Sequence, residues 1–178
     1  DGPVGLIVCD ATDGGLLRGY AKFERNRLPP FCYKKNNAAR LLGEGYLAFT
    51  VERGPDKERY QGIVELGGRT LEQCAHHYFQ QSVQYDAVLK LGVSQDRDKT
   101  WRAGGIMLQC LPRQESIAFG KKIDEAWSKH RDLVQKIKPI TLYQNCISPF
   151  SVLFELFNGD NIRVYEAKNL CAKCSCSK

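Results

Sequence analysis

Three cysteines near the end of the sequence have the residue type and spacing best suited to chemistry. Cys171, Cys174 and Cys176 form a C-x-x-C-x-C cluster that ends two residues before the last residue, Lys178. Two thiolates separated by one residue can bind a single soft cation such as zinc, but a tetrahedral zinc site requires four ligands. Zinc bound in this way would need a further cysteine pair beyond Lys178.

Lysines flank this cluster, and ammonium groups favour the thiolate form of nearby cysteines. They are Lys168, Lys173 and Lys178. A metal and an oxidant compete for the same thiolates, because oxidation to a disulfide expels the metal together with the folding free energy that it supplied. The alternative is a terminal segment whose thiols have no role. We interpret the cluster as a candidate metal or redox switch.

The other five cysteines occur singly along the chain: Cys9, Cys32, Cys74, Cys110 and Cys146. The apolar neighbours of Cys9, Cys74 and Cys110 predict small buried side chains in a protein of a reducing compartment. Cys74 and His77 have the i, i+3 spacing of a metal-binding or thiol–base pair on a helix. We favour a third interpretation, in which Cys74 is a core residue and the neighbouring histidines lie on the surface, over both the metal-binding and the thiol–base role.

Composition restricts the class of protein. With 178 residues, of which 43% are hydrophobic, the chain can bury a core without disulfides. No stretch approaches the roughly 20 apolar residues of a membrane span, and no signal peptide is evident, which predicts a cytoplasmic protein. The sequence begins at Asp1, so we expect more chain before it, and an organellar location stays open. The net charge of +6 is scattered among acidic residues rather than arranged in a stripe, so we expect no nucleic-acid partner.

The first two-thirds of the sequence predict strands joined by turns. Alternating or apolar runs mark strands at residues 4–9, 18–23, 87–93 and 101–111, and an antiparallel hairpin at residues 46–51 and 59–66. Thr70 can cap a helix in which Leu71, Cys74 and Tyr78 follow helical spacing. Gly104 and Gly105 indicate a bulge or a close approach of another backbone.

Helices dominate from residue 114 onward. An amphipathic stripe predicts one helix that ends before Pro139. A second helix is expected between the N-cap Ser148 with Pro149 and the stop signal Asn158–Gly159. A last short strand is expected at residues 162–166. The apolar residues predicted to pack from these two helices are Ile123, Trp127, Leu133, Val134, Ile137, Val152, Leu153, Leu156 and Phe157.

Seven short segments occur in order along nearly the whole chain: DGP (1–3), RGY (18–20), GY (45–46), ERYQGIV (58–64), YF (78–79), AGGIMLQ (103–109) and CSC (174–176). Together they resemble the heat-shock protein 33 family of redox-regulated holdase chaperones. The resemblance implies an α+β fold, in which a layered β/β/α body with antiparallel-rich sheets is followed by linker helices.

The resemblance also implies a role for each part of the chain. Residues 1–113 would be the client-binding core, residues 114–168 the helical linker that covers it, and residues 169–178 the start of a zinc module. Cys174 and Cys176 would be its first zinc pair, whereas the family pattern does not call for Cys171. By similarity, oxidation with mild unfolding releases zinc, loosens the linker and exposes the surface to unfolded clients without ATP. Family members are commonly dimers when active.

The leading hypothesis is thus a non-enzymatic, ATP-independent chaperone in which Ile123, Trp127, Val134, Ile137, Leu153, Leu156 and Phe157 cover an apolar sheet. The alternative from another class is a zinc-dependent thiol/disulfide oxidoreductase whose tail cysteines attack and resolve disulfides. A disulfide-reductase assay on Cys174→Ser and Cys176→Ser variants separates the two. A third hypothesis, a basic RNA-binding module, predicts affinity that falls steeply with salt.

Overall fold

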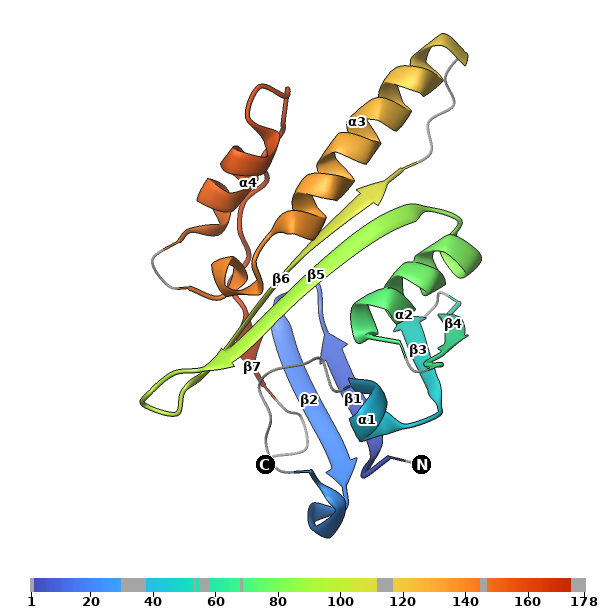
Figure 1. The fold of residues 1–178 in the computed structure, drawn as a ribbon, viewed down its shortest axis with the longest axis vertical. Coiled ribbons are helices and arrows are strands. Elements are labelled where there is room, and N and C mark those ends of the chain that lie inside the picture. Colours follow the sequence, from blue (N-terminus) through green and yellow to red (C-terminus); the bar gives the residue numbers. More distant parts are fainter. Residues whose placement is uncertain are drawn as a thin grey trace. The chain divides into compact units, whose positions relative to one another are not determined.

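The computed structural model describes residues 2–29, 38–52, 54, 58–67, 69–111, 117–144 and 147–173, with only the backbone described for residues 117–123. Helices and largely antiparallel sheets occur together (Figure 1), which confirms the predicted α+β class. In chain order the elements are β1 (Val4–Ala11), β2 (Leu16–Phe23), η1 (Arg25–Arg27), α1 (Ala38–Leu42), β3 (Tyr46–Val51), β4 (Tyr60–Glu65), α2 (Leu71–Tyr78), η2 (Phe79–Val83), β5 (Asp86–Gln95), β6 (Trp101–Cys110), α3 (Ile117–Lys136), η3 (Pro139–Leu142), α4 (Pro149–Phe157) and β7 (Cys171–Ala172).

The chain forms two compact units. The first comprises Asp1–Leu47, Glu65–Leu71 and Arg163–Lys178, and the second comprises Ala48–Val64 and Glu72–Ile162. The predicted boundaries at residues 113 and 168 separate segments by their expected roles, whereas these units are separated by compactness. The predicted boundaries therefore stay a prediction.

The first unit is built on the β1–β2 hairpin. The two strands pair in antiparallel register, with Val8 opposite Tyr20 and Cys9 opposite Gly19. In the turn between them, Gly15 has a φ of +83°, in the left-handed region that favours glycine. The hairpin places β2 in the middle of a sheet of order β1-β2-β7 (Figure 1).

The final strand is not where the sequence predicts it. Residues 162–166 have no regular structure and are exposed, so the strand expected there is wrong. Strand-forming residues such as Ile162 and Val164 do not make a strand without a neighbouring strand to pair with. Pairing occurs instead at β7, where Cys171 and Ala172 lie beside Leu16 and Leu17 in parallel.

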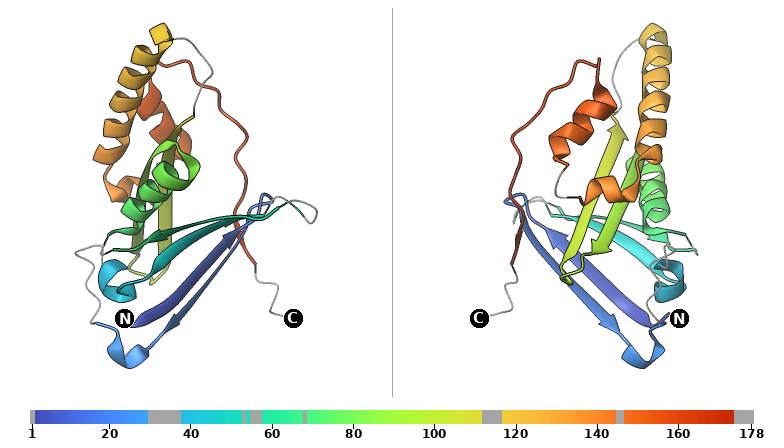
Figure 2. Two further views of the ribbon diagram at one scale, coloured as in Figure 1. Left: turned by 90° about the vertical axis from the view of Figure 1, so that its right-hand side faces the viewer. Right: turned by 60° about the vertical axis from the view of Figure 1, so that its left-hand side comes forward.

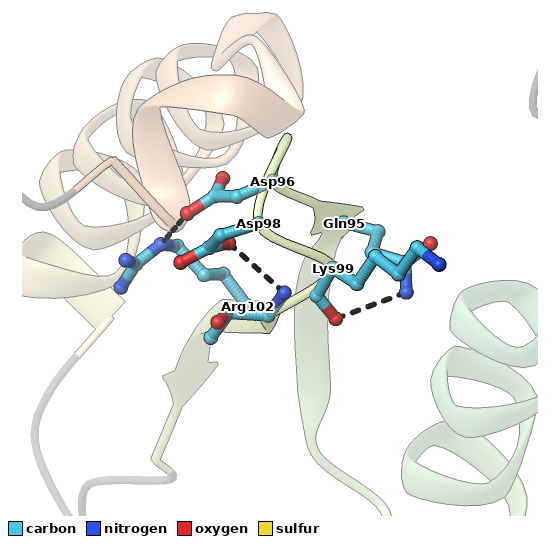
Figure 3. A network of polar contacts seen from close by, with 6 residues as sticks. Gln95, Asp96, Asp98, Lys99 and Arg102 are labelled. Carbon is cyan, nitrogen blue, oxygen red and sulfur yellow. Dashed lines mark hydrogen bonds and ion pairs between the residues drawn. The ribbon is translucent and has the colours of Figure 1, made fainter.

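The second unit is built on β5 and β6, which pair antiparallel in an unbroken register from Asp86 opposite Cys110 to Gln95 opposite Trp101. Of the two alternatives predicted at Gly104 and Gly105, the bulge is therefore absent from this ladder. A polar network closes the connecting turn (Figure 3). Asp96 forms an ion pair with Arg102, and the side chain of Gln95 donates to the Lys99 carbonyl at 3.0 Å.

Two of the predicted helices, α2 and α4, are confirmed, and α4 also has its predicted end signals. In α2, Cys74 and Tyr78 are buried, as their spacing predicts, and the helix continues as the π-helical turn η2. In α4, the Ser148 hydroxyl accepts a hydrogen bond from the Ser151 N–H at 3.1 Å, which satisfies one of the unpaired donors of the first turn. Among the helices that the structure describes, none is both long and apolar enough to cross a bilayer.

Candidate functional site: the covered sheet and the cysteine tail

One face of the β5–β6 sheet lies under the two C-terminal helices, which run beside it in Figure 2. Val88 of β5 lies opposite Leu108 of β6, so both side chains are on the same face. They pack with Val134 of α3 and with Val152 and Leu156 of α4. We call this set, with the half-buried residues around it, the cover cluster; those residues are Ile106, Trp127, Leu133, Ile137, Ile147 and Phe157.

The residues predicted to cover the sheet differ in how deeply they are buried, and one of them lies outside the cover cluster. Val134 is fully buried and Leu156 is buried, while Trp127, Ile137 and Phe157 are half-buried members. Leu153 is half-buried but does not belong to the cluster. Ile123 lies in α3, but its side chain is outside the described residues. The expected role of these residues as a releasable cover stays a prediction.

Outside the sheet strands, three members of the cover cluster are not among the cover residues predicted from the sequence: Leu133, Ile147 and Val152. Val152 and Leu156 are four residues apart on α4, the spacing that places two side chains on one helical face. Leu133 directly precedes the fully buried Val134, and both were recognised as apolar helix residues. Ile147 precedes the cap of α4, where no periodic pattern signals burial.

The loop before α4 also lies close to the sheet. The backbone of η3 passes beside the β5–β6 ladder at Gly92 and Gly104, at distances that leave no room for a side chain. This confirms the close backbone approach predicted at Gly104. The connection between α3 and α4 is therefore packed on the sheet together with the helices.

A polar contact ties α3 to the end of α4. His130 Nε2 lies 2.8 Å from Asp160 Oδ2, and the His130 ring stacks on Phe157 with 4.9 Å between centroids. The hydrogen bond from His130 holds the pKa of Asp160 below its ordinary value, with a smaller contribution from the charge of Lys129. This contact orients the two helices at the rim of the apolar cover cluster.

Helix α2 contacts β5, and a small polar cavity beside this contact is also lined by residues of α3. The Nδ1 atom of His76 lies 2.5 Å from the Ala87 carbonyl oxygen. A cavity of about 240 Å³ is lined by His76, Gln80, Asp86, Trp127, Arg131 and Gln135. The buried Trp127 Nε1 has no hydrogen-bond partner among the described residues.

The start of the cysteine tail is attached to the first unit through its main chain. The Cys171 N–H donates to the Gly15 carbonyl at 2.9 Å, and the Lys173 N–H donates to the Leu17 carbonyl at 3.0 Å. Lys168 Nζ lies 2.6 Å from Asp13 Oδ1, and this ion pair lowers the pKa of Asp13. Both partners of the pair are exposed.

The described part of this tail includes one of the three candidate thiols. Cys171 is exposed and free, whereas Cys174 and Cys176 lie outside the described residues. Within the described ranges, no three His, Cys, Asp or Glu side chains are grouped closely enough to hold a metal. An exposed thiol followed in sequence by two more is a donor set that suits zinc, once a fourth ligand is supplied.

The cysteines that occur singly along the chain differ in their burial. Cys74 is fully buried, which agrees with a core residue, and burial raises the pKa of the half-buried Cys110, helped by the charges of Asp86 and Asp124. The predicted burial of Cys9 is wrong, because this residue is exposed. Its cross-strand neighbour is Gly19, which has no side chain to cover the thiol.

Comparison with known proteins identifies the relatives of this chain. The model of the Hsp33 protein family matches residues 1–178. The chain belongs to the Hsp33 family. It is 34% identical over 183 residues to a 33 kDa chaperonin of Caulobacter vibrioides and 30% identical over 178 residues to a 33 kDa chaperonin of Yersinia pestis.

This Hsp33-family chain spans 60% and 56% of the lengths of those two relatives, and both matches cover the whole of it. Among solved structures, it is similar to the 33 kDa chaperonin (heat shock protein 33 homolog) of Thermotoga maritima. The TM-score is 0.75 at 22% identity, and the match covers 99% of this chain and 58% of that one. At this identity the likeness shows a shared fold.

Proposed function

We propose that the protein is an ATP-independent, redox-regulated holdase chaperone that binds unfolded proteins when its zinc-binding cysteines are oxidised. The observation that carries the proposal is the cover cluster. Helices α3 and α4 bury Val134 and Leu156 against Val88 of the sheet. Since unfolded segments also seek apolar surface, release of the helices would leave an apolar sheet face for clients.

Membership of the Hsp33 family supports the same function, because the relatives are named chaperonins. Binding by apolar area has little sequence specificity, which suits a chaperone with many clients. The helices and the clients would compete for one surface, so loosening the helices raises affinity for clients. A homodimer of the active form is part of this proposal.

The redox half of the proposal rests on the cysteine tail. Cys174 and Cys176 would hold zinc together with a further cysteine pair, and Cys171 is an additional candidate ligand. When bound, zinc would cross-link these segments and add its binding free energy to their folding. Hydrogen peroxide would oxidise two thiols to one disulfide and be reduced to two waters, after which those sulfurs no longer act as thiolate ligands.

The test uses the whole protein with its full set of cysteines. Light scattering by guanidinium-unfolded citrate synthase should be suppressed by the peroxide-treated form and only weakly by the reduced form. Zinc content, measured before and after peroxide, should fall in parallel. Equal suppression by both forms, with no metal in the reduced form, would overturn the proposal.

Single cysteine variants assign the ligands. Cys174→Ser and Cys176→Ser should each lower the zinc content of the reduced protein and activate it without peroxide. Cys171→Ser is the matched comparison, because Cys171 is in the same tail but outside the family pattern. If Cys171→Ser alone removes zinc, the proposed first zinc pair is wrong.

A further inference from the structure

Strand β7 occupies only a small part of the edge of β2. It pairs with Leu16 and Leu17, whereas β2 continues to Phe23. In the part of the chain that the structure describes, no strand pairs with residues 19–23 on the side of β2 away from β1. An unpaired strand edge presents N–H and C=O groups to which another extended chain can add.

The hydrogen bonds show which main-chain groups face this edge. The Leu17 carbonyl accepts from β7, whereas the Leu16 carbonyl accepts from the N–H of Thr12 at 2.9 Å, on the side of β1. The N–H and C=O groups of successive residues point to alternate sides of a strand. Those of Gly19, Ala21 and Phe23 therefore point to the same side of β2 as those of Leu17. The open edge is therefore a continuation of the edge on which β7 lies.

The attachment of β7 is slight compared with the length of this edge. It includes the two main-chain hydrogen bonds that the Gly15 and Leu17 carbonyls accept, and the contacts of Lys168 Nζ with the carboxylate and the carbonyl oxygen of Asp13. Ion pairs between exposed side chains contribute little to stability. Residues 161–173 are exposed, so side-chain burial adds little to their attachment.

We propose that β7 holds the place of an extended client segment, and that unfolded proteins bind by adding a strand to the edge of β2 once β7 has left it. This inference rests on the proposed chaperone function and adds the edge of β2 to the apolar sheet face as a second surface that binds the client. An incoming segment can pair with β2 from Leu16 to Phe23 and so make more main-chain hydrogen bonds than β7 makes.

Strand addition suits a client of any sequence, because the hydrogen bonds involve main-chain groups that every unfolded chain carries. Side chains along β2 supply apolar contact for the added strand, since Leu16, Tyr20 and Phe23 are exposed. The two modes of binding are complementary: the edge aligns an extended segment, and apolar surface adds affinity.

The position of β7 connects this edge to the cysteine tail. Lys173, whose N–H is bonded to Leu17, directly precedes Cys174 in the sequence. A change in the backbone at Cys174 therefore acts on the residue that holds β7 in place. Under this proposal, a change at the tail cysteines frees the edge of β2 as well as the covered sheet.

Proline substitutions in β7 test the proposal. Lys173→Pro removes the N–H that donates to Leu17 and leaves β2 unchanged. The control is Ala172→Pro: the N–H groups of both its neighbours point to β2, so its own points away. Lys173→Ala controls for the lost charge. Without oxidant, Lys173→Pro should suppress citrate synthase aggregation severalfold more than both controls, and equal suppression would overturn the proposal.

Amide hydrogen exchange locates the client on the otherwise unmodified protein. After peroxide activation and binding of unfolded citrate synthase, exchange at Gly19, Ala21 and Phe23 should slow. Even-numbered residues of β2, whose N–H groups face β1, should change less. Suppressed aggregation without slower exchange at these three amides would place the client elsewhere and overturn this inference, while leaving the chaperone function standing.

A substitution on the edge itself gives a second readout. Ala21→Pro removes one N–H from the open edge without touching the residues that pair with β7, and Ala21→Ser keeps that N–H. The proline variant should need severalfold more protein for half-maximal suppression after peroxide, and the serine variant should not. Loss of suppression in every form, including the unmodified oxidised protein, would instead contradict the proposed function together with this inference.

Discussion

Gly92 and Gly104 face each other across the β5–β6 ladder, and the backbone of η3 passes against both. A Cβ atom added at Gly104 would lie 1.7 Å from the Leu142 carbonyl oxygen, and one added at Gly92 would lie 2.4 Å from that of Pro139. Real Cβ atoms do not approach oxygens this closely. The paired glycines thus permit the connection between α3 and α4 to lie on the sheet.

Gly104→Ala should therefore lift η3 from the sheet and weaken the packing of both helices. Overpacking in a close contact typically costs about 1–3 kcal/mol, so we expect a loss of that size in the free energy of unfolding. Urea denaturation followed by fluorescence measures it. Gly105→Ala is the matched control, because its Cβ would meet the end of the flexible Leu91 side chain at 2.9 Å. An equal loss in both variants would contradict the role of the η3 contact.

Val134 is the most buried side chain of the cover cluster, with none of its surface exposed. Val134→Ala removes two methyl groups and leaves a cavity between α3 and the sheet, which should cost roughly 2 kcal/mol. If the helices compete with clients, the variant should also suppress citrate synthase aggregation without oxidant. Val164→Ala, at an exposed position outside regular structure, is the control and should change neither measurement.

Local signals allowed much of the fold to be predicted. Both ends of α4 follow from Ser148, Pro149 and Gly159, because capping depends on neighbours in sequence. The close approach at Gly104 was also predicted, because a glycine pair inside a strand indicates space taken by another backbone. What approaches it, the Leu142 carbonyl, follows only from the packing of residues far apart in sequence.

The features that the sequence did not reveal depend on such distant partners. Strand β7 is two residues long, and it exists because Gly15 and Leu17 offer carbonyls to it across more than 150 positions of sequence. The apolar neighbours of Cys9 suggested burial, but exposure is decided by what packs on the strand. In the candidate site, helical periodicity indicated Val134 and Leu156, while Ile147 lies outside any periodic run.

The Ser148 cap should stabilise α4 on the cover cluster. Ser148→Ala removes the acceptor of the Ser151 N–H, and loss of such a cap costs about 1 kcal/mol. Urea denaturation should show this loss. Ser151→Ala is the control, because it keeps the N–H and removes only a hydroxyl that lies 3.1 Å from the Ser148 hydroxyl. If both substitutions cost the same, the cap hydrogen bond does not hold α4.

The contact between His130 and Asp160 predicts a pH dependence with a definite sign. Because the hydrogen bond from His130 lowers the pKa of Asp160, the contact stabilises the fold above the ordinary carboxyl pKa and is lost as the pH falls through the lowered value. In His130→Gln, NMR titration of the Asp160 carboxyl carbon should give a higher pKa. Asp98, whose pKa is lowered by the Thr100 N–H in the distant β5–β6 turn, is the internal control and should titrate as before. An unchanged Asp160 titration would show that His130 does not hold this carboxylate, and an equal rise at both carboxyls would show a general change in the fold instead.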